Sequence, residues 1–244
     1  MQQPHPIPSR KRATHRSFPV ALLGLVVASC GGGNSSPPLL EALVIHPDEI
    51  DWEAVLEGRE VFAEAATEYP FSFYGDAPEL DGMLEPQFSY LVPMGTAAYS
   101  PVTGRVVRVT EIYSGDFTIQ IGAPGQTQPA PVWEVEHVID VLVEEGDTVV
   151  AGQRIATASD ASCRVNPTYC EYDLAVIEFG FLTRHGHECP YAPDLVSPAH
   201  AAAIDAELDA MFATVRGLGD DPTAYDRSAW ETSNCKTLDV VDPR

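Results

Sequence analysis

Basic side chains are scarce in this sequence. Its 244 residues include 14 Lys and Arg against 36 Asp and Glu. Four of the basic residues lie within the first 29 residues, and the remainder has a net charge of about −26. A surface of that sign repels the phosphates of nucleic acid and the headgroups of anionic lipids. Both are therefore excluded as partners.

The sequence also lacks a long apolar run where a membrane span could begin. The apolar run from Phe18 to Val27 is too short for a hydrocarbon core of ~30 Å, which needs roughly 20 residues. A basic stretch precedes it and small residues follow it, as in an export signal. The junction Val27-Ala28-Ser29-Cys30 resembles the lipobox of bacterial lipoproteins. The resemblance implies a signal peptide over 1–29 and a lipid on Cys30.

Residues 30–38 are rich in glycine, serine and proline, as expected of a flexible tether after an anchor. An ordinary cleaved signal followed by an unmodified cysteine is the alternative. The lipoprotein interpretation predicts an exported chain that meets the membrane through its lipid alone. Gly31 stands where an aspartate would resemble an inner-membrane retention signal. This favours the outer membrane, facing the periplasm or the cell surface.

Four cysteines remain once Cys30 is assigned to lipid: Cys163, Cys170, Cys189 and Cys235. An even number in an exported chain predicts two disulfides. Of three possible connectivities we favour one that joins the first two cysteines and the last two. Zinc is the rival interpretation, but no pair has the two-residue spacing of a structural zinc site.

Short β-rich runs separated by turn residues dominate the middle of the chain, which predicts an all-β pattern. The expected strands are 97–99, 104–110, 117–121, 132–137, 140–143, 148–150, 154–156 and 172–181, with an exposed loop at 122–131. On the last strand Leu174, Val176 and Glu178 share one face.

Helices are expected on either side of this β region. Residues 39–84 form an N-terminal extension, in which apolar positions between Trp52 and Phe62 indicate a short helix. Residues 182–244 form a C-terminal extension tied by disulfides. There Ser197 and Pro198 suit a helix start, and apolar residues at helical spacing predict an amphipathic helix over 198–216.

Three stretches together resemble a known family. They are 93–107 around Gly95 and Gly104, then Glu136-His137-Val138, and then 143–156 with the turns Gly146-Asp147 and Gly152-Gln153. In order and spacing they resemble the lysostaphin and LytM type zinc endopeptidases that cut peptidoglycan cross-bridges. The resemblance covers 85–181. It implies a mainly β fold, an antiparallel LytM-like core related to the barrel-sandwich hybrid, followed by the C-terminal helix.

The metal ligands of that family are missing. Alignment on Gly95 puts Glu85 and Ser89 at the ligand positions that the family fills with His and Asp. Alignment of 173–176 with the family's His-x-His strand puts Asp173 at the base and Ala175 at a ligand position. Glu, Ser and Ala cannot hold an open catalytic zinc site.

Only His137 matches a family histidine. With Glu85 and Asp173 it forms the candidate catalytic set, either a residual acid/base group or a polar remnant. We expect no cofactor and an inactive peptidase-like domain. The resemblance implies binding or regulation at the cell wall, with peptidoglycan or a wall-remodelling enzyme as partner.

An active zinc endopeptidase with an atypical site is the alternative. His185 and His187 form another His-x-His pair, and with His137 and nearby carboxylates they could hold zinc. Gly186 and the Cys189-Pro190 pair favour solvated loop histidines instead. A biotinyl or lipoyl carrier is excluded, because beyond the leader the only lysine is Lys236 in the tail. No Gly-x-Ser-x-Gly elbow, phosphate loop or dinucleotide fingerprint occurs either.

Overall fold

The computed structural model describes residues 36–62, 71–72, 87–161, 170 and 173–219. The chain divides into two units, Met1–Asn34 and Ser35–Arg244, and every described residue belongs to the second. The leader, Cys30, Glu85, Cys163 and Cys235 lie outside the described residues. Within the described part of the chain no helix is both long enough and apolar enough to span a membrane.

Strands make up most of the described elements. In chain order these are η1 (Pro47–Glu49), α1 (Trp52–Phe62), β1 (Phe71–Ser72), β2 (Phe88–Pro93), β3 (Ala97–Tyr99), β4 (Gly104–Glu111), β5 (Phe117–Gly122), β6 (Val132–Ile139), β7 (Thr148–Val149), β8 (Arg154–Ala158), β9 (Leu174–Thr183), β10 (Gly186–Glu188) and α3 (Ala201–Leu218).

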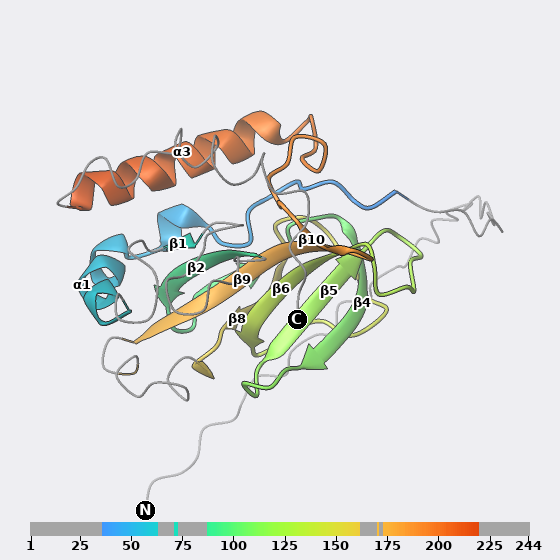
Figure 1. Cartoon of the computed structure of the whole chain (residues 1–244), viewed down its shortest axis with the longest axis horizontal. Helices are drawn as coiled ribbons and strands as arrows, with labels where there is room; N and C mark the ends of the chain where they lie inside the picture. The colour runs from blue at the N-terminus through green and yellow to red at the C-terminus, as the bar shows by residue number, and fades with distance from the viewer. Residues whose placement is uncertain (1–35, 63–70, 73–86, 162–169, 171–172, 220–244) are drawn as a thin grey trace, which may run out of the picture. The chain divides into compact units, whose positions relative to one another are not determined.

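One sheet holds these strands, in the order β1-β2-β9-β6-β5-β4-β7 (Figure 1). β10 pairs with β9, while β8 joins β3 to β6. All pairs of named strands are antiparallel. The predicted fold class, mainly antiparallel β with a C-terminal amphipathic helix, is confirmed.

One face of the sheet carries the hydrophobic core. Alternate residues of β6 and β9, such as Trp133 and Phe179, are fully buried there, and these two rings stack with centroids 5.4 Å apart. The helix α3 contacts α1 and η1 (Figure 1). Its buried residues recur at helical spacing: Ile204, Leu208, Met211, Phe212 and Val215. Apolar residues of both extensions belong to the same core as the strands.

Most strands lie where the sequence predicts them, with ends shifted by one or two residues. Residues 140–143 are the exception, since they form no strand. Asp140 has a positive φ of 49°, which turns the chain away from the line of β6. The pattern also missed β2 and β10.

The C-terminal helix begins later than predicted, at Ala201, with His200 as its N-cap. The backbone N–H groups of His200 and Ala201 both donate to the Ser197 carbonyl oxygen, so Ser197 and Pro198 form a turn before the helix. The helix continues past Gly217 to Leu218. A single glycine weakens a helix without ending it.

Candidate functional site

The second face of the sheet is lined by polar side chains, in contrast to the apolar core face. A first row runs across four strands, from Thr118 on β5 through Glu136 on β6 and Glu178 on β9 to Ser89 on β2. Glu178 is the register partner of both Glu136 and Ser89. The Thr118 hydroxyl donates to Glu136 Oε1 over 2.7 Å. Because register partners on adjacent strands point to one side, these side chains share a face.

A second row lies two residues along the same strands and includes the hairpin strand β10. Glu134 is the partner of Gln120 on one side and of Gly180 on the other. The Gln120 amide nitrogen lies 2.7 Å from Glu134 Oε1, and His187 Nε2 lies 2.7 Å from Glu134 Oε2. Glu134 is only 4% exposed. The two rows together are called the polar face below.

Gly180 provides the space for two neighbouring side chains, those of Gln87 and His187. A Cβ atom built there would lie 2.7 Å from Gln87 Cγ and 3.0 Å from His187 Cδ2. Both side chains therefore lie directly over the glycine, on the side where Glu134 points.

We expect Gly180→Ala to displace Gln87 and His187 and to lower the free energy of unfolding by about 1–2 kcal/mol, as overpacking does. Urea unfolding measures the loss. Gly217→Ala is the matched control, since its Cβ would meet nothing within 4 Å and alanine is the better helix former by about 1 kcal/mol. Equal effects at both positions would contradict the packing described.

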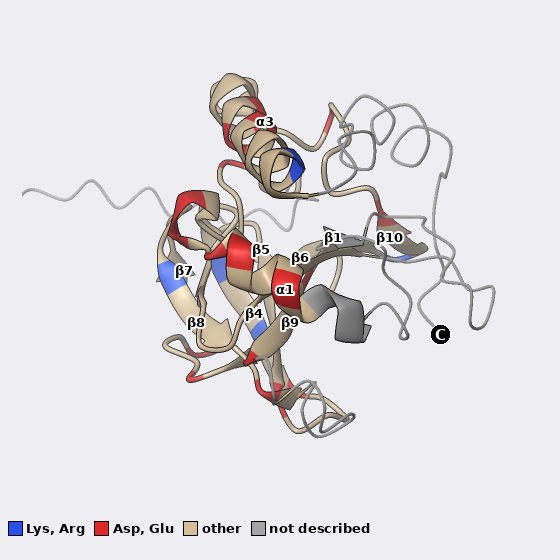
Figure 2. Cartoon of the chain, turned by 90° about the vertical axis from the view of Figure 1, so that its left-hand side faces the viewer, with Lys and Arg blue, Asp and Glu red and all other residues tan. Residues whose placement is uncertain are grey.

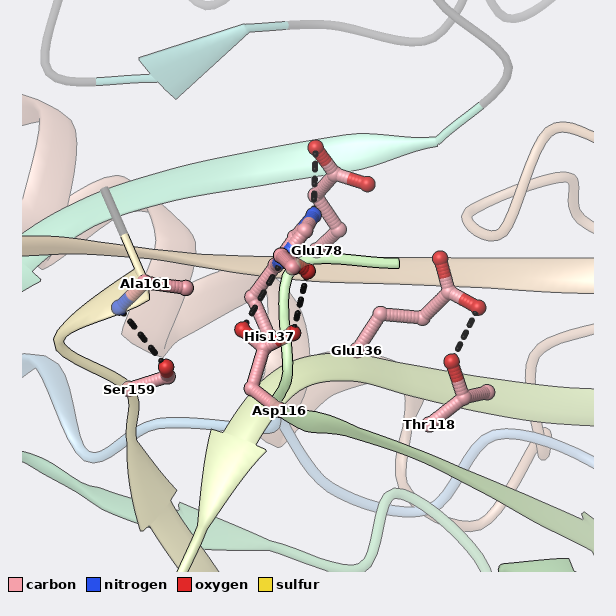
Figure 3. Close-up of polar contacts among 8 residues, drawn as sticks. Asp116, Thr118, Glu136, His137, Ser159, Ala161 and Glu178 are labelled. Carbon is pink, nitrogen blue, oxygen red and sulfur yellow. Dashed lines mark hydrogen bonds and ion pairs between the residues drawn. The ribbon is translucent and has the colours of Figure 1, made fainter. Parts of the chain in front are cut away.

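His137 lies at one end of the polar face, where the sheet is irregular. Phe117 pairs with Val138 and Ile119 with Val135, so Thr118 faces two residues of β6. His137 has a φ of 58°, and this bulge brings its ring to the same face as Glu136 (Figure 3). A regular strand would have pointed neighbouring residues to opposite faces.

Both ring nitrogens of His137 face carboxylates (Figure 3). Nδ1 lies 3.0 Å from Asp116 Oδ2, and Nε2 lies 3.6 Å from Glu178 Oε1. Asp116 is completely buried, whereas His137 is 18% exposed and Glu178 24% exposed. The Ser114 hydroxyl donates to the other oxygen of Asp116.

These contacts determine the charge of the site. Burial lowers the pKa of His137, but the carboxylates of Asp116 and Glu178 outweigh burial and raise it to about 11. Burial raises the pKa of Asp116, yet its bonds to His137 and Ser114 outweigh that effect and lower it. An imidazolium and a carboxylate therefore stand side by side at neutral pH.

The pKa of Glu136 is raised, whereas that of Asp116 is lowered. Burial raises the pKa of Glu136, and the negative charge of Glu134 raises it further. Glu178, directly across on β9, acts in the same direction. The polar face thus contains a carboxylate whose neighbours oppose its charge.

Of the predicted catalytic set, His137 lies at this site and Asp173 does not. Asp173 is exposed just before β9, where its backbone carbonyl accepts from Met94 N–H, and Glu85 lies outside the described residues. The carboxylates that contact His137 are those of Asp116 and Glu178. Asp116 carried no sequence signal beyond an acid after the Ser114-Gly115 turn.

The register also revises the alignment of the His-x-His strand. Two ligands of one metal must stand close together, and Ser89 faces Glu178 across the β2–β9 pair. Ala175 instead faces Val92, three residues further along. In this structure Glu178 therefore occupies the place next to Ser89 that the alignment assigned to Ala175.

The prediction of solvated loop histidines is wrong for His187. It lies on β10, is 5% exposed and contacts Glu134. Gly186, with a φ of 125°, ends a tight turn after Thr183 and lets the chain return along β9. His185 in that turn is exposed. Within the described ranges no group of three or more His, Cys, Asp or Glu is placed to hold a metal ion.

The cysteine pairing stays a prediction. Cys170 and Cys189 each take part in a disulfide, while Cys163 and Cys235 lie outside the described residues.

No family model matches the sequence, and no curated protein matches it. Several solved structures are similar at low identity. The catalytic domain of the prophage-encoded M23 protein EnpA from Enterococcus faecalis is 20% identical with a TM-score of 0.37, covering 52% of this chain and 94% of that one. The catalytic domain of the antimicrobial peptidase lysostaphin from Staphylococcus simulans is 17% identical with a TM-score of 0.38, covering 53% and 92%.

A chain of the SpoIIQ–SpoIIIAH pore forming complex is 12% identical with a TM-score of 0.40, covering 70% of this chain and 98% of that one. Likeness of this degree says nothing about activity.

Proposed function

We propose that this chain is a cell-envelope lipoprotein. Its peptidase-like domain acts in binding or regulation at the cell wall and does not hydrolyse the wall. The lipobox-like junction before Cys30 and the tether that follows support the envelope anchor. The glycine turns around 93–107 and 143–156, with the family resemblance they carry, support the cell wall as its place of action. The partner is peptidoglycan or a wall-remodelling enzyme.

The contacts of His137 carry the proposal that the domain is inactive. A general base needs a free lone pair near neutral pH. Here both ring nitrogens face carboxylates, at 3.0 and 3.6 Å, and the pKa of about 11 keeps the ring protonated. A charged imidazole with both nitrogens engaged does not take a proton from water.

The alternative, an active zinc peptidase with an atypical site, needs His137, His185 and His187 to share a metal. The contacts of the described residues do not favour it, because His185 is exposed while the other two histidines bind different carboxylates. The absence of zinc stays a prediction.

Co-sedimentation of the full-length chain with isolated peptidoglycan sacculi tests the proposal. We expect the chain to pellet with sacculi and to release no soluble wall fragments. Failure to pellet would favour a structural envelope lipoprotein that binds no glycan. Metal analysis of protein purified without a His-tag tests the alternative, and stoichiometric zinc that is lost in His187→Ala would contradict the proposal.

A further inference from the structure

Three carboxylates stand together on the polar face with little positive charge to balance them. Glu136 and Glu178 are register partners, and Glu134 is two residues away on β6. In the described part of the chain no Lys or Arg pairs with any of the three, and their ion pairs are those with His137 and His187. Lys and Arg are few on the described elements altogether (Figure 2). Buried carboxylates in such a group need a cation or a proton.

Two buried amides point to a ligand independently of these charges. Gln87 is 4% exposed and lies over Gly180. Its amide interacts with the Glu136 carboxylate and favours the charged form of that group, and among the described residues Nε2 makes no further hydrogen bond. Gln120 is 9% exposed, and its Oε1 atom has no hydrogen-bond partner in the described part of the chain. Buried polar atoms without partners are rare in folded proteins, and each calls for a partner such as a water molecule, an ion or a ligand group.

The chemistry of these groups selects the ligand. A primary ammonium donates three hydrogen bonds and carries the missing positive charge. Carboxylates and the Gln120 carbonyl oxygen accept such bonds, while the Gln87 amide donates to a carbonyl oxygen. A peptide with a free amine offers both. Glu178, 24% exposed, marks the side from which a ligand can approach.

We propose that the polar face binds a peptide through a primary ammonium group, held by Glu136 and Glu178, with Gln87 donating to a peptide carbonyl. This inference rests on the proposed binding function and names its ligand class. The amine comes either from a basic side chain or from a peptide N-terminus.

Calorimetric titration of the full-length chain in detergent at pH 7 tests the proposal with three probes. Acetyl-alanyl-lysine amide carries a side-chain amine, alanyl-glutamine amide carries a terminal amine, and acetyl-alanyl-acetyllysine amide carries neither. We expect one or both amines to bind and the third probe not to bind.

Glu136→Gln tests the site, because it removes the charge and keeps an oxygen for Thr118. We expect it to weaken amine binding by about tenfold or more, as loss of a charge-assisted hydrogen bond does. Glu111→Gln on β4, an exposed carboxylate, is the control and should leave binding unchanged. Thermal unfolding confirms that both variants are folded.

Equal binding of all three probes, equal loss in both variants, or no binding of either amine would each overturn the inference. If sacculi still pellet with the wild-type chain and with Glu136→Gln while neither amine binds, the proposed function survives and the ammonium site fails. If an amine binds but sacculi do not pellet, the wall-binding function fails and the ammonium site stands.

Discussion

Replacing His137 with Asn should lower the free energy of unfolding by about 3 kcal/mol, the loss typical of breaking a buried ion pair. Asp116 is fully buried and 3.0 Å from the ring, so the variant leaves its carboxylate without a cation. Asn is the appropriate replacement, because it tolerates the positive φ of 58° at this position better than other side chains do. The loss then reports the charge, with little contribution from backbone strain.

A double-mutant cycle with Asp116→Asn separates the pair from its surroundings. We expect the double variant to be more stable than the sum of the single losses predicts, because the single His137→Asn variant contains an unpaired buried charge and the double variant does not. Additive losses, measured by urea unfolding at pH 7, would show that the two groups are not coupled.

The same pair predicts how stability depends on pH. The folded-state pKa of His137 is raised from 6.5 to about 11. A raised histidine pKa contributes stability that is complete below the unfolded value and is lost as the pH rises through the folded value. The stability difference between wild type and His137→Asn should therefore shrink as the pH rises from about 7 to about 11. A constant difference over this window would contradict the assigned charge.

The sequence predicted the strands better than the site because strand signals are local. Runs of β-branched residues bounded by turn residues located β4, β5 and β6 within two residues. A regular strand points successive side chains to opposite faces, however, so the sequence pattern alone would place His137 on the face opposite Glu136. The bulge at His137 breaks this alternation. It depends on the pairing of β5 with β6, which no local sequence pattern reveals.

The partners of the two histidines could not be predicted for a related reason. Asp116 is 21 residues from His137 and Glu134 is 53 residues from His187. Their proximity follows from the strand order β9-β6-β5 and from the return of β10 along β9. Motif alignment found His137, because this residue belongs to a local sequence pattern. The same alignment paired Ser89 with Ala175, whereas the residue of β9 that faces Ser89 is Glu178. The spacing of the glycines does not reveal a shift of three residues on another strand.

Replacing Glu134 with Ala should destabilise the fold about as much as loss of His137, by about 3–4 kcal/mol, since two buried donors lose their acceptor. Gln120 Nε2 and His187 Nε2 each lie 2.7 Å from a different oxygen of this carboxylate. Glu134→Gln should lose less, because its single carbonyl oxygen can still accept one of the two hydrogen bonds. Glu111→Ala, at an exposed position on β4, should change stability by less than about 0.5 kcal/mol.

Urea unfolding of the three variants at pH 7 gives the ranking. A loss below about 1 kcal/mol in Glu134→Ala would mean that water replaces the carboxylate and that this row is open to solvent. The expected large loss would mean that the second row is part of the framework. Glu134 would then orient Gln120 and His187, and Glu136 and Glu178 in the first row would be the carboxylates left to meet a ligand.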